Sequence, residues 1–228
     1  MQSLSRRLRD AGLQGQKIDA VLVTHGHTDH TSGIGALVKK YRIPVFMNEG
    51  TRFETEYLQG IDRWECFDPD RSFSIGDLEI EPFSTSHDSA QPVGFRFRAE
   101  GIRGVLATDL GEIDSVVGTR LSGCDWLILE SNHDEHLLKI GPYPWPLKQR
   151  VLGRRGHLSN SAVARFLENQ FDGQASAIFL AHLSRQNNDP EIALDSAQRA
   201  LMKRRNSLFE SCKLHLTHQA KPSIVLEL

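Results

Sequence analysis

A short stretch near the amino terminus carries an unusual density of side chains that bind metal ions. Residues 21–35 read VLVTHGHTDHTSGIG, and within six positions they place His25, His27, Asp29 and His30. Alternate residues of an extended or turning segment point to the same side, so His25 and His27 can hold one cation together. Asp29 and His30 follow at the start of a predicted helix, where they can face a second cation. Neutral imidazole suits zinc, iron and manganese, and a carboxylate adds the charge that holds a second ion close by.

Five predicted strands are each followed by a residue that can bind metal or move a proton. AVLVT is followed by His25, IEPFSTS by His87, GVLAT by Asp109, DWLIL by Glu130, and AIFLA by His182. Taken singly, each residue has a structural alternative: a histidine at a strand end can belong to the core, and an aspartate there can cap a helix. Because layered folds place their sites where strand ends converge on one sheet edge, we expect the five to form one site.

The pattern predicts a centre for two divalent cations. His87 is the predicted third ligand of the ion held by His25 and His27. Two cations about 3.5–4 Å apart need a bridging carboxylate. Asp109 is the aspartate that most cleanly ends an apolar strand, and His182 supplies the terminal ligand of the second ion.

A further pair of residues suits acid–base chemistry. Two metals polarise a phosphoryl or acyl group and deliver hydroxide, but the leaving oxygen still needs a proton. We predict that His157, in GHLSN, donates this proton and that Glu130, in ESNHD, orients its ring; two unrelated loop residues remain the alternative. Ser159 and Asn160 could cap the following helix and present backbone N–H groups to an anion.

A basic run lies directly before this histidine. A charge run is usually a solvated face, and that alternative stays open. Because this run lies beside His157, we nevertheless predict that it contacts phosphate. The predicted contacts are Lys148, Arg150, Arg154 and Arg155 of PLKQRVLGRRGH. Trp145, between prolines in GPYPWP, could stack a base, but packing in the core is its predicted role.

The elements that must position these side chains include both helices and strands. Helices are predicted over about 3–12, 31–41, 51–59, 112–121, 159–170 and 190–205, with helical turns over about 134–153. Strands are predicted in AVLVT, IPVFMN, SFSIGDLEIEPFSTS, DWLILE, AIFLA, KLHLTH and PSIVLEL, with a hairpin in GFRFRAEGIRGVLAT. Hairpins together with crossovers indicate an α+β or layered α/β sandwich.

The composition is that of an ordinary globular chain. Its 228 residues include 39% hydrophobic and 25% charged residues at a net charge of −2, so nothing at whole-chain level indicates a nucleic-acid binder. We expect one domain over residues 1–228. Three scattered cysteines predict free or buried thiols in a reducing compartment. Without a signal peptide or an apolar run long enough to span a bilayer, we expect a cytoplasmic protein with no membrane association.

The motif THGHTDH, with the later histidines and aspartate at these separations, resembles that of the metallo-β-lactamase fold. The resemblance implies a four-layer αββα sandwich, of mixed α/β (α+β) class, with one or two metals at the sheet edge. It implies that His25, His27 and His87 bind a first metal. It further implies a second metal bound by Asp29, His30 and His182, with Asp109 bridging.

Longer motifs resemble the YycJ-like (WalJ) branch of that fold. They are SHDSAQPVGFRFR, LATDLG, LESNHD, GPYPWPLKQRVL, GHLSN and LAHLSRQNN, and they cover most of residues 20–188. That branch implies a cytoplasmic exonuclease that acts on DNA from 5′ to 3′. Ribonucleases of the same fold that mature tRNA place a glutamate and a histidine beside two metals, which supports the pairing of Glu130 with His157. Relatives normally begin with a further strand pair, so we expect an incomplete first sheet.

We therefore predict a hydrolase that needs two divalent ions, zinc or manganese with iron also suitable, and that cleaves phosphodiester bonds in nucleic acid, DNA above RNA. Its predicted catalytic residues are Asp29, Asp109, Glu130 and His157. One alternative is hydrolysis of a thioester or lactam by the same metals. Another is a metal-binding regulatory protein with little catalysis.

Overall fold

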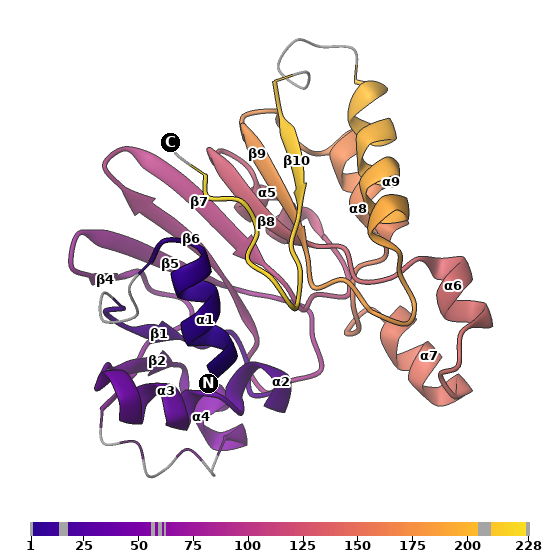
Figure 1. The fold of residues 1–228 in the computed structure, drawn as a ribbon. Helices are drawn as coiled ribbons and strands as arrows, with labels where there is room; N and C mark the ends of the chain where they lie inside the picture. The colour runs from indigo at the N-terminus through magenta and orange to yellow at the C-terminus, as the bar shows by residue number, and fades with distance from the viewer. Residues whose placement is uncertain are drawn as a thin grey trace.

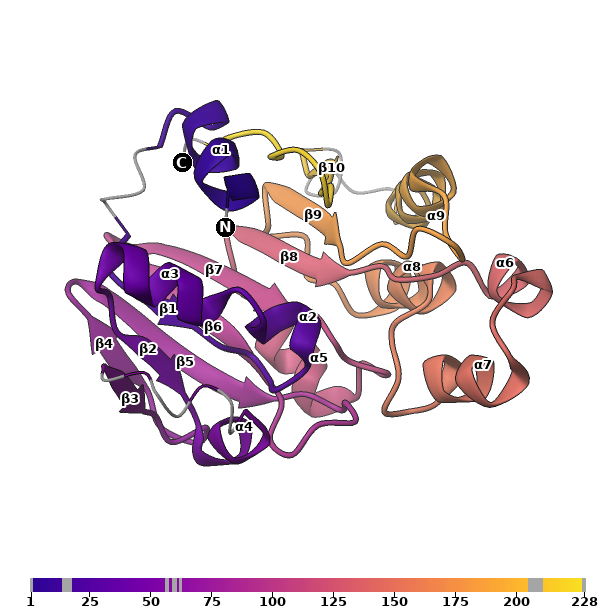
Figure 2. The ribbon, with the colours of Figure 1, turned by 60° about the horizontal axis from the view of Figure 1, so that its bottom comes forward.

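The computed structural model describes residues 2–13, 18–55, 58, 61, 63–204 and 211–226. Within these residues two β-sheets lie face to face, and helices cover both outer faces (Figures 1 and 2). The predicted four-layer αββα sandwich is therefore confirmed.

The strands of the described residues form two sheets. The smaller sheet has the order β1-β2-β3 and is parallel throughout, and the larger has the order β10-β9-β8-β7-β6-β5-β4. Their bounds are β1 Val21–Leu22, β2 Val45–Met47, β3 Trp64–Cys66, β4 Phe73–Ile75, β5 Leu78–Ser84, β6 Val93–Ala99, β7 Ile102–Ala107, β8 Trp126–Glu130, β9 Ala177–Ala181 and β10 Lys213–Leu216.

The described helices other than α1 form three groups. α2, α3 and α4 lie with the smaller sheet, α5, α8 and α9 lie with the larger one, and α6 and α7 stand beyond its edge (Figure 2). Their bounds are α1 Gln2–Asp10, α2 Thr28–Thr31, α3 Ile34–Tyr41, α4 Glu49–Glu54, α5 Ser115–Leu121, α6 Glu135–Ile140, α7 Trp145–Leu152, α8 Asn160–Asn169 and α9 Pro190–Met202.

Apolar side chains fill each gap between layers. Val45 and Met47 of β2 pack with Ile34 of α3 on the outer side of the smaller sheet. Phe46, between them in sequence, joins the cluster around Phe95 that lies between the two sheets. This alternation is the two-residue period of a strand, and it fixes which face of β2 meets which layer.

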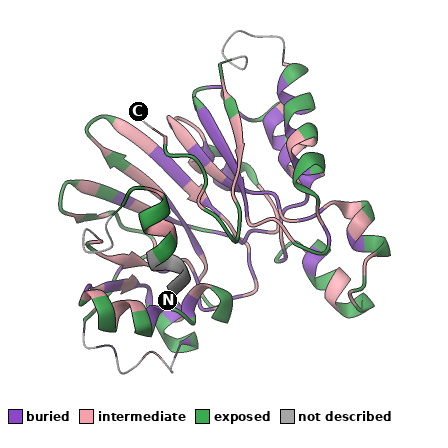
Figure 3. Ribbon diagram, in the orientation of Figure 1, coloured by how far each residue is buried: buried purple, intermediate pink, exposed green. Residues whose placement is uncertain are grey.

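The centre of the larger sheet is covered on both faces. All five residues of β9, AIFLA, are buried (Figure 3). A parallel strand that is buried on both sides reads as a continuous apolar run rather than an alternating one. The third cluster, which includes Ile178 of β9, Phe166 of α8 and Ala197 of α9, attaches these helices to the sheet.

The direction of the strands determines where their polar neighbours gather. β5 and β7 are both antiparallel to β6, and β7, β8 and β9 are mutually parallel. The carboxyl ends of β5, β7, β8 and β9 therefore lie at one edge of the larger sheet, where layered folds place their sites.

Several predicted elements differ from the structure. The predicted closing strand PSIVLEL is wrong in its described part, because residues 222–226 are not strand; an apolar run makes a strand only where a neighbour can pair with it. β3, Trp64–Cys66, was not predicted, and it pairs with β2. The helix predicted over 51–59 runs from Glu49 to Glu54, and residues 56, 57 and 59 lie outside the described residues.

The predicted core packing of Trp145 is also wrong. Its side chain is 62% exposed, because it begins α7 in the helical pair that stands beyond the sandwich. None of the helices in the described residues is long and apolar enough to cross a membrane.

Phe95 should dominate the stability of the layer between the sheets. It is fully buried and contacts both Phe67 and Phe97. Phe95→Ala should lower the free energy of unfolding by about 3–5 kcal/mol, because it removes a large side chain and leaves a cavity. Phe53→Ala is the control, since Phe53 is 76% exposed and should change little. Urea unfolding measures both, and equal losses in the two variants would contradict this description of the core.

Candidate metal centre and active site

Three histidines from distant parts of the chain meet at the edge of the sandwich. His25 and His27 follow β1, and His87 follows β5. Candidate ligand nitrogens of the three lie within 4.8 Å of one another. His87 Nδ1 lies 2.9 Å from the carbonyl oxygen of Gly156 and can only donate to it, so Nε2 keeps its lone pair. That Nε2 lies 3.3 Å from His27 Nδ1.

His25 is held in its neutral form. Its ring is 1% exposed, and its Nε2 has no hydrogen-bond partner in the described part of the chain. Burial, together with the nearby His30, His87 and His27, lowers the pKa of His25 to about 2. A neutral imidazole with an unused lone pair is the form that binds a metal ion.

Asp109 stands at the centre of the site. Its carboxylate is 2% exposed, with Oδ2 3.4 Å from His30 Nε2 and Oδ1 3.3 Å from His182 Nδ1. Within the described residues Oδ2 accepts no hydrogen bond. Asp29 lies beside the same histidine, 3.7 Å from His30 Nε2, and is 69% exposed.

Backbone strain is concentrated at two of these residues. Asp109 has φ 61° and His182 has φ 59°, both in the left-handed region that non-glycine residues seldom adopt. Asn132 donates from Nδ2 to the carbonyl oxygen of His182 at 2.9 Å, which helps to hold that conformation. Strained residues of this kind persist where the surrounding structure over-determines them, and they gather at functional sites.

Glu130, at the end of β8, ties the site to the sheet. Its Oε2 accepts hydrogen bonds from the backbone N–H groups of Leu110 and Leu158, both at 3.1 Å. Its Oε1 accepts from Nδ1 of His157 at 2.8 Å and from Nδ1 of His182 at 2.7 Å. Glu130 is therefore in contact with His157, and it also holds His182, a contact that the strand-end pattern does not predict.

These hydrogen bonds shift the pKa values of all three groups. Burial alone would raise the pKa of Glu130, but the bonds from His157 and His182 outweigh it and lower that pKa. Burial alone would likewise lower the two histidine pKa values. Hydrogen bonding to Glu130 instead raises the pKa of His157, and together with the charge of Asp109 it raises that of His182 to about 9. Both Nδ1 atoms therefore carry protons, and both Nε2 atoms face away from Glu130.

The residues present fit divalent cations. Buried lone pairs on His25 Nε2 and Asp109 Oδ2 have no hydrogen-bond partner in the described residues. Candidate ligand atoms lie within 4.8 Å of one another in four sets that are linked by shared residues. The charges and unpaired lone pairs of such a cluster of imidazoles and carboxylates are balanced only when protons or metal ions bind. The four sets are His25, His27 and His87; His25, His30 and Asp109; Asp29, His30 and His182; and Asp109, Glu130, His157 and His182.

One glycine lets the loop after α7 reach the site. A Cβ atom on Gly156 would lie 2.2 Å from the carbonyl oxygen of Val151 and 2.3 Å from that of Arg150, so no other residue fits without backbone movement. The close approach places the Gly156 carbonyl against His87 and the ring of His157 beside Glu130.

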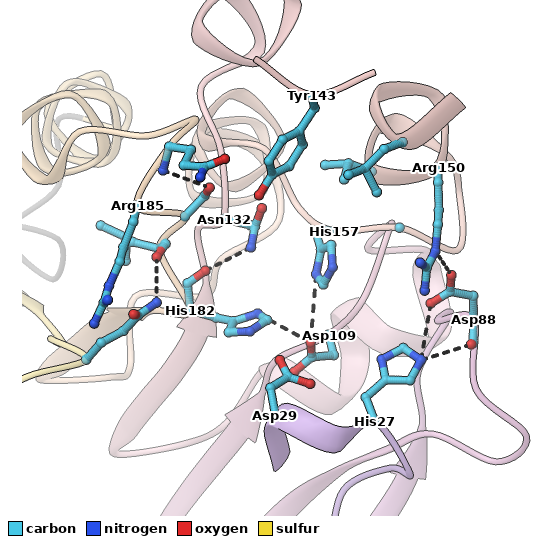
Figure 4. A pocket seen from close by; sticks show the side chains of 17 residues that line it. His27, Asp29, Asp88, Asp109, Asn132, Tyr143, Arg150, His157, His182 and Arg185 are labelled. Carbon is cyan, nitrogen blue, oxygen red and sulfur yellow. Dashed lines mark hydrogen bonds and ion pairs between the residues drawn. The ribbon is translucent and has the colours of Figure 1, made fainter. Parts of the chain in front are cut away.

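These side chains border a cavity of about 390 Å³, a size that accepts a small ligand. His157 and His182 line it together with Asp109, and Tyr143 enters it from the connection between α6 and α7 (Figure 4). Arg150 and Arg185 lie on opposite sides of His157 in that view (Figure 4).

The predicted basic run is divided among different contacts. Arg150 lines the cavity and forms an ion pair with Asp88. Arg154 is 82% exposed and pairs with Glu112. The other two bind backbone oxygens: Lys148 donates to the carbonyl of residue 139 at 2.6 Å and Arg155 to that of residue 87 at 3.1 Å.

Ser159 and Asn160 are placed mainly by contacts within the fold. Ser159 is the N-cap of α8, as predicted, and its Oγ accepts from the N–H of Ala162 at 3.2 Å. Asn160 donates from Nδ2 to Asn188 Oδ1 at 2.8 Å. Neither side chain lines the cavity, and their contact with an anion stays a prediction.

Three further residues support or line the site. Asp88 is 3.7 Å from His27 Nε2, and Glu54 accepts a hydrogen bond from the N–H of Ala90 at 2.7 Å, which ties the loop after His87 to α4. Arg185 lies three positions beyond His182 in LAHLSR, and this spacing only weakly indicates a cation beside the site.

Comparisons with known proteins agree with this geometry. Residues 1–182 match the model of the β-lactamase superfamily domain. The chain is 34% identical over 233 residues to an exodeoxyribonuclease YycJ of Bacillus anthracis, covering 95% of this chain and 88% of that protein. It is 35% identical to an exodeoxyribonuclease WalJ of Streptococcus pneumoniae, covering 84% and 78%. The fold resembles the metallo-β-lactamase fold protein YhfI of Bacillus subtilis, with TM-score 0.69, 19% identity, and coverage of 93% and 79%.

Because of Glu130, the metal-free protein should lose stability as the pH rises into the alkaline range. The pKa of His182 is about 9 in the folded chain and 6.5 in the unfolded one, so its contribution is complete below pH 6.5 and is lost as pH rises through 9. We expect a loss on the order of 2 kcal/mol between pH 6.5 and 9.5. In Glu130→Gln that loss should shrink, because the charge that raises the histidine pKa is gone.

Urea unfolding in chelator at the two pH values measures this difference. Glu79→Gln is the matched control, since Glu79 is 50% exposed and lies on β5 away from the site. It should keep the parent's pH dependence. If Glu130→Gln loses as much stability as the parent over this range, Glu130 does not set the pKa of His182.

Proposed function

This chain belongs to the YycJ/WalJ branch of the β-lactamase superfamily, and from that premise we propose that it is a metal-dependent hydrolase that cleaves phosphodiester bonds in nucleic acid. Within that class we propose a DNA exonuclease that works from 5′ to 3′. DNA is the substrate in the names of the two relatives. The polarity rests on the resemblance of the sequence motifs.

We propose two divalent ions, zinc or manganese, as its cofactor. His25, His27 and His87 would hold the first, and Asp29, His30 and His182 the second, with Asp109 between them. When bound, the ions would offset the charge of the phosphodiester and lower the pKa of the attacking water. Imidazole and carboxylate ligands without a thiolate support zinc, manganese or iron.

The position of His157 is the observation that carries the proposal. Its Nδ1 donates to Glu130, so its Nε2 is the atom that can give a proton to a leaving group. The raised pKa of His157 favours the protonated form that such a donor needs. Its ring lies close to the proposed metal ligands, with Nδ1 3.7 Å from Asp109 Oδ1.

The surroundings of the cavity support an anionic substrate. Arg150 and Arg185 line it, and its volume of about 390 Å³ can take one terminal nucleotide. Of the predicted phosphate contacts, Arg150 has the best support, because it alone of the basic run lines the cavity. The three free thiols support a reducing compartment, and we propose that the chain acts in the cytoplasm.

His157→Ala should lower the turnover of end-labelled single-stranded DNA by about 10²–10⁴-fold, because the leaving oxygen loses its proton donor. Its bound metal, measured by elemental analysis, should stay near the parent's. His136→Ala is the matched control, since His136 is exposed on α6 and should leave turnover unchanged. Strands labelled at the 5′ or the 3′ end test the polarity, because a 5′-to-3′ enzyme releases the 5′ label first.

A variant at His157 that cleaves DNA as fast as the parent would refute this role. Parallel assays on a glutathione thioester separate the two kinds of hydrolase. Faster turnover of the thioester than of the DNA end would overturn the proposed substrate. Absence of any cleavage with Mn²⁺, Zn²⁺ or Mg²⁺ would instead favour a regulatory protein.

Asp109→Ala should reduce the bound metal from two ions per chain to at most one, because the carboxylate between the two sets of ligands is removed. Elemental analysis after dialysis measures the stoichiometry. Asp77→Asn, at an exposed turn of the hairpin between β4 and β5, should keep both ions. Two ions in the Asp109 variant would show that this residue does not bridge.

A further inference from the structure

A second cavity adjoins the active-site cavity. It has a volume of about 530 Å³, and it shares five of its lining residues with the active-site cavity. The shared wall is the loop directly after β9 together with one residue of the segment after β10: His182, Leu183, Ser184, Arg185 and Gln219. Because the two cavities share a wall that includes a proposed metal ligand, they adjoin one another beside the proposed metal centre.

The outer wall of this second cavity is the segment that follows β10. Thr217 anchors that segment, since its N–H donates to the carbonyl of Leu180 at 2.9 Å. Gln219 donates from Nε2 to the carbonyl of Leu183 at 3.5 Å, which joins the segment to the loop after β9. The outer wall is thus attached to the same strand end that positions His182.

The two cavities differ in charge. Asp29, Asp88 and Asp109 line the active-site cavity, and they suit cations. The second cavity is lined by Arg185 and Lys221, and no carboxylate is among its described lining residues. No ion pair to either cation occurs in the described part of the chain. Two cations that face an open cavity without acidic partners attract anions.

We propose that the second cavity binds the phosphate backbone of the nucleic-acid strand whose end lies in the active site. This inference rests on the proposed function and extends it to a binding site away from the scissile bond. Arg185 and Lys221 contact successive phosphates, and Leu183, Ala220 and the side chains near them provide apolar surface for sugars and bases. Such contacts are insensitive to sequence, so the cavity would accept strands of any sequence.

The proposal predicts that binding depends on strand length. A mononucleotide reaches only the active-site cavity, whereas a longer strand also reaches Lys221. Lys221→Gln should therefore weaken the binding of a single-stranded 12-mer by roughly three- to tenfold, which is the loss expected for about one phosphate contact. It should leave the binding of thymidine 5′-monophosphate unchanged.

Salt dependence provides a second, independent readout. Each phosphate contact to a single strand contributes about 0.7 to the slope of log K against log salt concentration. Lys221→Gln and Arg185→Gln should each lower the slope for the 12-mer by about that amount. Lys39→Gln is the matched control, because Lys39 is an exposed lysine of α3 that lines neither cavity, and its slope should equal the parent's.

Fluorescence anisotropy of the metal-loaded protein with a phosphorothioate 12-mer makes these measurements, because that strand keeps its charges and resists hydrolysis. Parental affinity and slope in both cavity variants would overturn the proposal. So would an oligoglutamate peptide that binds as tightly as the strand and is weakened equally by Lys221→Gln, since the site would then bind acidic peptides. The outcome is separate from that of the proposed function, which is judged by cleavage of unmodified DNA.

Discussion

The buried carboxylate of Glu130 is the group on which the geometry of the site depends. A fully buried negative charge is costly unless its hydrogen bonds are complete. Two backbone N–H groups satisfy Oε2, and His157 and His182 satisfy Oε1. The same four bonds join the ends of β7, β8 and β9 to the loop before α8. The carboxylate therefore fixes in one place a proposed metal ligand and the proposed proton donor, and it sets which nitrogen of each ring is free.

The fold brings these groups together through the direction of its strands. β5, β7, β8 and β9 end at one edge of the larger sheet, and the loop after β1 meets them from the smaller sheet. Apolar layers make this edge rigid, while the left-handed backbone at Asp109 and His182 turns both side chains inward. The energy of the packed layers thus maintains a cluster of imidazoles and carboxylates that is unfavourable without bound cations.

Charge is divided along the surface that a substrate would follow. Carboxylates gather where the metals are proposed to bind, and cations without acidic neighbours among the described residues face the adjoining cavity. An anionic strand is attracted to the second region. In the first region Arg150 and Arg185 attract it, whereas the carboxylates oppose it until metal ions offset their charge. Metal binding and strand binding are therefore coupled by electrostatics, even though different residues carry them.

The sequence by itself determined the local chemistry. The spacing of His25, His27, Asp29 and His30 places four candidate ligands within six residues. The apolar runs before His87, Asp109, Glu130 and His182 predicted strand ends at a common edge. Most helices and strands followed from the same periodicity. The tertiary structure alone decided the contacts between distant segments. It gave Glu130 a second histidine, exposed Trp145 and divided the basic run. It also left residues 222–226 without a partner strand and placed Arg185 and Lys221 on the wall of one cavity. Periodicity reports which faces are buried, but the choice of partner depends on packing between elements far apart in the chain.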